Sequence, residues 1–524
     1  MGIHAAACTT KQWLRELFTP PCAHGGSACR RREPVFDKLP VDIIHHIHSL
    51  LPVRDAARAA CVCRGFLRSW RCYTNLTLSV ETLGLTGKKY KDDADIFLMD
   101  AKILINVVDK ILRNHSRHGM EISRLDLELY PCKNIDASYL DRWLQITAVR
   151  PGIKELKLVL CRSMKKEYIF PCSVLSNEAA ASSVRSLELH ACAFHPTTTL
   201  GWLSRLETLC LYRVNITDEG LGHLLSKSFS LGQIDIINCS KIICLKIPCT
   251  LQKLNVLKVS WCGRLQAVEI NAPNLSTLHF IGALVEISVA DPSQLQDVHL
   301  IGPSHLLSYA RAKLSYTAPN VKSLSLISLW ENVDIPMMPS KFPYLTKLTI
   351  DILRSLQGCF IRFDVLSLVS FLDASPALDS FTLHVGQDTL RPDDSVVGGD
   401  NANYERWQPQ CRHDHLRQVT ITGFCSSKKL AQFVIYLLES SPRLDCLTLD
   451  TTPGPRYSTK CGITRKHTSS KKMGICCPMM TESNIAEAQR AVEVANTYIA
   501  GRVPSGVGFQ VLEPCSECNN PKRR

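Results

Sequence analysis

A short apolar phrase recurs at nearly constant intervals through most of the chain, and it constrains the fold more than any other feature of the sequence. The phrase is Leu-x-Leu, in which Ile, Val or Phe replaces a leucine in some copies. From Leu187 to Leu348 successive copies start 22, 25, 23, 21, 20, 26 and 24 residues apart. Apolar residues at alternate positions predict a strand with one buried face, and the near-constant interval predicts stacked copies of one structural unit. The copies occupy residues 125–127, 156–158, 187–189, 209–211, 234–236, 257–259, 278–280, 298–300, 324–326, 348–350, 381–383, 419–421 and 447–449.

Intervals of about 20–29 residues with this phrase are typical of leucine-rich repeats. We therefore expect an α/β architecture in which residues 81–386 form an irregular solenoid, with parallel strands on one side and helices and loops on the convex side. The outer residues of each phrase point into the core, and the middle residue faces the concave surface. Five of these middle residues are candidates for binding a protein target: Glu188, Asp235, Lys258, His279 and His299.

The chain contains 24 cysteines, and several of them recur just after the strand phrase. A thiol in that position packs as a small, weakly polar core group, so we expect core residues and neither metal ligands nor a cofactor. The pair Cys515 and Cys518 does not form a zinc ribbon with the adjacent Cys476 and Cys477. Residues 1–17 lack the apolar segment of a signal peptide. This predicts an intracellular protein, whose cysteine thiols are expected to stay reduced. The recurring cysteines are Cys161, Cys192, Cys239 and Cys262.

Ahead of the repeats, a stretch of about 40 residues has helical apolar spacing but is too small to bury a sufficient core alone. Pro40 suits the first turn of a helix, and Pro52 ends that helix and begins a second. A third helix is predicted around Phe66 and Trp70. The surplus apolar surface is expected to dock onto the rest of the chain or onto a partner. Adjacent helix positions point in different directions, so we expect solvated or partner-facing side chains, and no metal site, for His45, His46 and His48.

This stretch resembles an F-box of the plant type. The resemblance lies in the opening Leu39-Pro40, the central Leu-Leu-Pro-Val-Arg-Asp-Ala-Ala of residues 50–57 and the closing Trp70, whereas Gly65-Phe66 departs from the Arg-Trp usual in the family. It implies a three-helix F-box within residues 35–80 that binds the Skp adaptor and, through it, cullin and RING subunits. The resemblance assigns adaptor binding to Leu39, Pro40, Ile43, Ile44, Ile47, Leu51, Pro52, Val53, Val62, Phe66 and Trp70.

Near the other end, residues 412–452 resemble the FBD segment of plant F-box proteins with leucine-rich repeats. The resemblance rests on a strand around Val419, a helix with one apolar face and a second strand around Leu447. The remaining segments are predicted from composition: a disordered leader at 1–34, an exposed insertion at 387–411, a loop at 453–480 and, at 481–524, a helix capped by Ser483 followed by a basic tail. The apolar face of the predicted helix consists of Leu430, Phe433, Val434, Leu437 and Leu438.

The charge distribution limits the partners that we expect. The 61 Lys and Arg against 48 Asp and Glu give a net charge of +13, but the basic residues are scattered and form no stripe with interleaved aromatic residues, so no nucleic-acid partner is expected. No stretch reaches the roughly 18 apolar residues of a membrane span, so no membrane partner is expected. No catalytic motif is present, and we expect a non-enzymatic protein of the nucleus or cytoplasm.

The F-box resemblance implies the substrate-recognition subunit of a Skp-cullin-F-box ubiquitin ligase. Such a subunit acts by holding an unknown protein substrate close to ubiquitin transfer. Three alternatives remain open at this point: a repeat scaffold without ubiquitination output, a ligand sensor, and a zinc or redox protein.

Overall fold

The chain forms two compact units, Met1–Ala272 and Pro273–Arg524. Predictions for the leader, for Leu39 and Val62, for the insertion before Cys411, for the loop after Thr452 and for the tail after Pro514 lie outside the residues that the structure describes. The computed structural model describes residues 40–61, 64–71, 74–85, 101–117, 122–130, 132–133, 135–148, 152–162, 164, 166–176, 181–197, 200, 203–303, 305–329, 331, 341–353, 363–386, 411–452 and 480–514.

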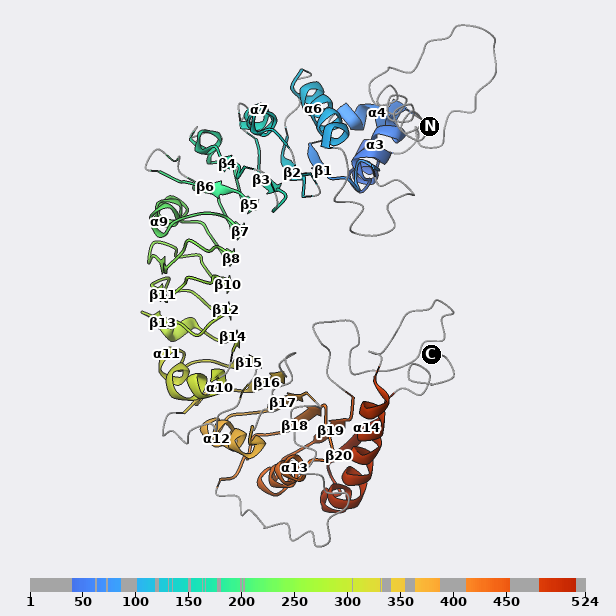
Figure 1. The fold of residues 1–524 in the computed structure, drawn as a ribbon, viewed down its shortest axis with the longest axis vertical. Helices are drawn as coiled ribbons and strands as arrows, with labels where there is room; N and C mark the ends of the chain where they lie inside the picture. The colour runs from blue at the N-terminus through green and yellow to red at the C-terminus, as the bar shows by residue number, and fades with distance from the viewer. Residues whose placement is uncertain are drawn as a thin grey trace, which may run out of the picture. The chain divides into compact units, whose positions relative to one another are not determined.

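The first unit begins with three short helices and continues as a parallel sheet in which the described strands pair in the order β1-β2-β3-β5-β7-β8-β10. Helices α6, α7 and α9 lie on one side of these strands (Figure 1). The shorter strands β4 and β6 form one parallel pair, and β9 and β11 form another. The elements are α2 (Val41–Ser49), α3 (Val53–Ala60), α4 (Arg64–Arg71), β1 (Asn75–Leu78), α6 (Ala101–Arg117), β2 (Arg124–Glu128), α7 (Ala137–Ala148), β3 (Glu155–Val159), β4 (Ile169–Phe170), β5 (Ser186–His190), β6 (Ala193–Phe194), β7 (Thr208–Tyr212), α9 (Asp218–Ser226), β8 (Gln233–Ile237), β9 (Cys244–Ile247), β10 (Val256–Ser260) and β11 (Ala267–Ile270).

The second unit carries parallel strands in the order β12-β14-β15-β16-β17-β18-β19-β20. Helices α10, α11, α12 and α13 lie on one side of them (Figure 1). Its elements are β12 (Thr277–Ile281), β13 (Glu286–Val289), β14 (Asp297–Gly302), α10 (Leu306–Tyr309), the π-helical η4 (Ala310–Leu314), α11 (Ser315–Thr317), β15 (Ser323–Leu329), β16 (Lys347–Leu353), α12 (Val369–Ala374), β17 (Ser380–Val385), β18 (Gln418–Thr422), α13 (Lys428–Ser440), β19 (Cys446–Asp450), α14 (Glu482–Val494), the π-helical η7 (Ala495–Ile499) and β20 (Gly508–Leu512).

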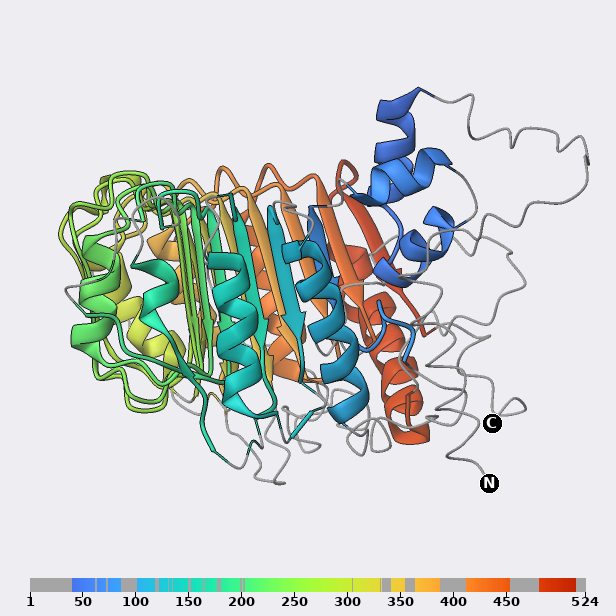
Figure 2. The same ribbon diagram turned by 90° about the horizontal axis from the view of Figure 1, so that it is seen from above.

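The Leu-x-Leu phrase produces the strands for the reason that the sequence indicates. Leu187 and Leu189 of β5 are fully buried, as are Leu209 and Leu211 of β7, and the same alternation recurs along each unit. Burying one leucine side chain stabilises the fold by about 1.5–3 kcal/mol, so each strand is held by its two outer residues. The strands run side by side, with helices against one face (Figure 2). The middle residues therefore project from the opposite face, here called the open face. The prediction of parallel strands in a leucine-rich-repeat solenoid is confirmed.

Three of the four cysteines that follow the strand phrase occupy the predicted core position. Cys161, Cys192 and Cys239 are buried, and Cys262 is half-buried. Among the described helices, none is long and apolar enough to cross a membrane.

Several elements differ from the prediction. Strand β1 lies within the residues assigned to the F-box, yet it pairs in parallel with β2 and so forms part of the repeat sheet. Strand β20 was not predicted, because its copy of the phrase, Phe509-x-Val511, starts 62 residues after the copy at Leu447, outside the repeat interval; it pairs with β19. The cap of α14 is Thr481, whose side chain accepts a hydrogen bond from the Asn484 amide at 3.3 Å, and the prediction of Ser483 was wrong by two residues.

Candidate functional site

Helices α2, α3 and α4, here called the N-terminal module, have a small apolar core of their own. Ile44 and Phe66 are buried at its centre, and Ile47 and Ala59 pack against them. Pro40 and Pro52 immediately precede α2 and α3, where a missing N–H costs no helical hydrogen bond.

A fully buried histidine joins the three helices. His48 Nε2 lies 2.8 Å from the Ala56 carbonyl oxygen, and His48 Nδ1 lies 2.8 Å from Ser69 Oγ. A carbonyl only accepts, so Nε2 donates to Ala56 and Nδ1 accepts from Ser69. The ring also lies 5.4 Å from Phe66 and 6.1 Å from Trp70, centroid to centroid. The prediction of a solvated or partner-facing His48 is therefore wrong, because this ring is an interior hydrogen-bonding group.

The same module leaves a set of large apolar side chains in solvent. Val41 is 59% exposed, Ile43 is 46% exposed and Leu50, directly after α2, is 71% exposed. Ile43 and Leu50 are seven positions apart, close to two helical turns, so they lie on one side of the helix, here called the exposed apolar face; Val41 points in another direction. Exposed clusters of this kind mark surfaces that another protein covers.

The residues that the resemblance assigned to adaptor binding divide into two groups in this structure. Ile44, Val53, Phe66 and Trp70 are buried, so they hold the helices together. Pro40, Ile43 and Pro52 are exposed, and Ile47 and Leu51 are half-buried, so these side chains are accessible to a partner. Leu39 and Val62 lie outside the described residues. The binding role of this set stays a prediction.

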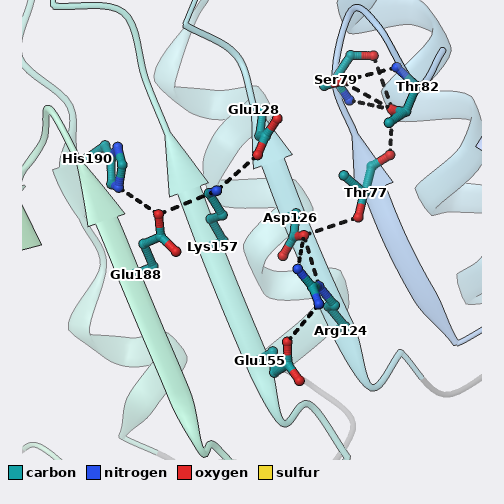
Figure 3. A network of polar contacts seen from close by, with 10 residues as sticks. All are labelled: Thr77, Ser79, Thr82, Arg124, Asp126, Glu128, Glu155, Lys157, Glu188 and His190. Atoms are coloured by element: carbon teal, nitrogen blue, oxygen red, sulfur yellow. Dashed lines mark hydrogen bonds and ion pairs between the residues drawn. The ribbon is translucent and has the colours of Figure 1, made fainter. Parts of the chain in front are cut away.

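A network of charged side chains crosses the open face of the first unit (Figure 3). It is here called the polar ladder, and its middle-position members stand opposite one another except at β7, where the neutral Cys210 lies between Glu188 and Asp235. Asp126 is opposite Lys157, Lys157 is opposite Glu188, and Asp235 is opposite Lys258. The members of the ladder are Arg124, Asp126, Glu128, Glu155, Lys157, Glu188, His190, Asp235 and Lys258.

One end of the ladder is organised by Arg124. Its guanidinium contacts Asp126 Oδ2 at 2.9 Å and Glu155 Oε2 at 3.2 Å. Thr77 Oγ1 donates to the same oxygen of Asp126 at 3.1 Å. Asp126 is buried, and these contacts supply the partners that a buried carboxylate needs.

The centre of the ladder is organised by Lys157. Its ammonium lies 3.0 Å from Glu128 Oε1 and 3.4 Å from Glu188 Oε1. Burial opposes the charge of Lys157, but the two carboxylates outweigh that effect and raise its pKa. His190 Nε2 lies 2.8 Å from Glu188 Oε1, and this contact is the largest cause of the lowered pKa of Glu188. The ladder thus keeps opposite charges in fixed, alternating positions.

Comparison with known proteins agrees with both parts of this structure. The family model described as "At1g61320/AtMIF1, LRR domain" matches residues 111–516, which is more than half of the chain. The chain belongs to this leucine-rich-repeat family. A second model, described as "F-box-like", matches residues 36–71 and so covers the N-terminal module of this At1g61320/AtMIF1-family chain.

The descriptions of two curated relatives of this family member name both an F-box and leucine-rich repeats. The F-box/LRR-repeat protein At5g02910 of Arabidopsis thaliana is 23% identical over 365 residues, which cover 66% of this chain and 71% of the relative. The F-box/LRR-repeat protein At3g03360 of the same plant is 22% identical over 442 residues, covering 79% and 83%. A solved leucine-rich-repeat protein of Leptospira interrogans, LIC12759, aligns with 65% of this chain and 93% of its own at 12% identity, but its TM-score of 0.31 is too low to support an argument.

The five predicted target-binding residues of this family member are half-buried and lie on the middle positions of their strands. In the first unit, Asp235 Oδ2 and Lys258 Nζ are 3.7 Å apart, and Glu188 contacts Lys157. In the second unit, the rings of His279 and His299 have centroids 5.2 Å apart, and burial followed by the neighbouring His279 lowers the pKa of His299. Whether any of them binds a target stays a prediction.

The sequence reasoning missed several members of the ladder. Asp126 and Lys157 are the middle residues of two copies of the Leu-x-Leu phrase. The alternation of charge from Asp126 through Lys157 to Glu188 could have predicted ion pairs between these neighbouring strands. Glu128 and His190 follow the phrase by one position, and pairing between neighbouring strands brings them into the network.

One group of side chains in the described part of the chain could hold a metal ion. The ligand atoms of Glu188, His190 and Cys210 all lie within 4.8 Å of one another. Burial, reinforced by Glu188 and Asp235, raises the pKa of the Cys210 thiol to about 12, so the thiol is neutral unless a metal deprotonates it. Lys157 already neutralises Glu188, so the cluster is accounted for without a metal.

Proposed function

We propose that this protein is the substrate-recognition subunit of a Skp-cullin-F-box ubiquitin ligase. The observation that carries the proposal is the exposed apolar face of the N-terminal module, in a segment that matches an F-box-like model. An F-box implies an adaptor of the Skp type as its partner. Covering such a face with a partner removes apolar area from water, which favours association by about 25 cal/mol per Å² before the costs of ordering.

The second half of the proposal concerns the target. The polar ladder is a pre-organised row of charges on the open face, and ordered charges give specificity because a mismatched partner meets like charges. Substrate recognition by this surface places the substrate near ubiquitin transfer, and the chain contributes proximity and no chemistry of its own. The protein acts in the nucleus or cytoplasm, where the other ligase subunits work.

The adaptor half is tested by co-purifying the full chain with a plant Skp adaptor. We expect Ile43→Asp combined with Leu50→Asp to weaken adaptor binding by about tenfold or more, because each change puts a charge into an apolar contact. Both side chains are exposed, so the fold should be unaffected. Ile169→Asp is the matched control, since Ile169 is 59% exposed but belongs to β4. Equal binding by the double variant and the control would refute the proposed contact.

Adaptor binding alone does not separate a ligase subunit from a scaffold. A reconstituted mixture of adaptor, cullin, RING subunit and ubiquitin enzymes provides the second readout. We expect the native chain to be ubiquitinated in that mixture and the double variant to remain unmodified. Adaptor binding without any ubiquitination would support the scaffold alternative and overturn the ligase assignment.

A further inference from the structure

A cavity of about 320 Å³ lies in the first unit, and its walls come from segments that follow the strands. Arg162 follows β3, Arg213 follows β7 and Asn238 follows β8, so the cavity is at the edge where these strands end. Asn215 and Ser240 also line it. None of the ladder residues is among the lining residues, so this is a different site on the same unit.

Arg213 is the residue that points to a ligand. Its guanidinium carbon lies 5.4 Å from the centroid of the Tyr212 ring, a distance at which a cation is attracted to the face of the ring. Its Nε is buried and has no hydrogen-bond partner among the described residues. That nitrogen has almost no accessible surface and so does not face the cavity; a ligand would have to pair with the terminal nitrogens of the guanidinium. Guanidinium groups pair best with carboxylate and phosphate, through two parallel hydrogen bonds.

The backbone at Arg213 adopts a conformation that recurs after several strands of this unit. Its φ angle is 54°, in the left-handed region. Ala191, Asn238 and Trp261 stand at the same place after β5, β8 and β10, with φ angles of 55°, 56° and 55°. Asn tolerates this conformation far better than Arg does. Because Ala191 and Trp261 share this conformation, it is a property of the turn; an Asn at position 213 would suit the turn but would lack the cationic side chain.

We propose that this cavity binds an oxyanion, carried by a small molecule or by a side chain of a partner. Arg213 and Arg162 supply the positive charge, and the side-chain amides of Asn215 and Asn238 and the Ser240 hydroxyl supply further donors. Glu167 also lines the cavity and accepts from Asn215 Nδ2 at 3.2 Å. Two arginines and one glutamate leave one net positive charge, which fits a ligand with a single anionic group. This site is independent of adaptor docking.

The test compares two variants that both relieve the left-handed backbone. Arg213→Asn removes the guanidinium, whereas Trp261→Asn makes the equivalent change at a position that does not line the cavity. Both variants are expected to fold and to unfold at a slightly higher temperature than the native chain. The probes are acetate and inorganic phosphate, titrated into the full chain at constant ionic strength, with binding measured by the shift of the thermal midpoint and by amide protection in β7 and β8.

We expect acetate or phosphate to bind the native chain and Trp261→Asn with equal affinity, and to bind Arg213→Asn at least about tenfold more weakly. Phosphate also stabilises proteins by exclusion from their surface, so the comparison between the two variants is the informative quantity. A peptide with one glutamate side chain, titrated beside free acetate, distinguishes the two sources: tighter binding of the peptide assigns the anion to a partner protein, and tighter binding of acetate assigns it to a small molecule. An equal response in all three chains overturns the site.

Discussion

The imidazole of His48 shows how one side chain sets the chemistry of the N-terminal module. Burial is the largest effect on this ring and lowers its pKa; the hydrogen bond to Ala56 acts in the opposite direction, and His45 adds to the lowering. Ser69, Phe66 and Trp70 also face the ring, and none of these three carries a charge. The burial of His48 could have been predicted from helical spacing. His48 follows the apolar Ile44 by four residues and so lies on the same helix face, whereas the prediction treated the three histidines of α2 alike.

The stability of the N-terminal module should therefore depend on pH. The folded-state pKa of His48 lies below the unfolded value near 6.5, so the unfolded module binds a proton that the folded one excludes. Stability is full above about pH 6.5 and falls as the pH falls toward the folded-state pKa. We expect amide protection in α2 and α4 to decrease over this range, and His48→Gln to reduce the pH dependence while lowering protection at neutral pH. His46→Gln, at an exposed position, is the control; an unchanged pH dependence in His48→Gln would rule out this residue as the cause.

At the scale of elements, every copy of the Leu-x-Leu phrase named in the sequence lies in a described strand, including β2 and β19, where burial does not alternate strictly. Strands β9 and β11 were not predicted, although burial alternates along both. Helix α13 also agreed with its prediction, because Leu430, Phe433 and Leu437 share one buried face. Strand β20 was missed because Phe509-x-Val511 lies far outside the repeat interval. Its side chains are only half-buried or exposed, and pairing with β19 holds the strand in place. The cavity around Arg213 could not be predicted, because it is assembled from four separate loops whose approach depends on the stacking of the repeats.

The N-cap of α14 offers a direct test of an element boundary. Thr481 Oγ1 accepts from the Asn484 amide, so removing this oxygen leaves a helix-end donor without its partner. We expect Thr481→Ala to destabilise α14 by about 1 kcal/mol, seen as faster amide exchange from residue 484 onward. Ser483→Ala should have a much smaller effect, because within the described residues Ser483 Oγ is hydrogen-bonded to the Thr481 hydroxyl, at 2.9 Å, and to no helix-end amide. A larger destabilisation of α14 by Ser483→Ala than by Thr481→Ala would instead identify Ser483 as the N-cap, as the sequence predicted.

At the scale of the whole molecule, the repeat architecture means that the stability of each repeat depends mainly on its own core and on its immediate neighbours. Each strand is hydrogen-bonded to its immediate neighbours, and each unit has its own internal contacts. In such arrays stability is close to a sum of repeat terms and nearest-neighbour terms. The irregular intervals and the two compact units mean that damage to one core should remain within that unit.

Two matched core substitutions test this expectation. Leu211 of β7 and Leu383 of β17 are both fully buried leucines of the strand phrase, one in each unit. Leucine-to-alanine changes at such sites cost about 2–5 kcal/mol through lost burial and the cavity left behind. We expect Leu211→Ala to speed amide exchange in β5, β7 and β8 while β16 to β18 keep native protection, and Leu383→Ala to give the reverse pattern. A uniform loss of protection over both units in either variant would mean that they unfold as one cooperative body, in which case the oxyanion cavity of the first unit would be coupled to the strands of the second.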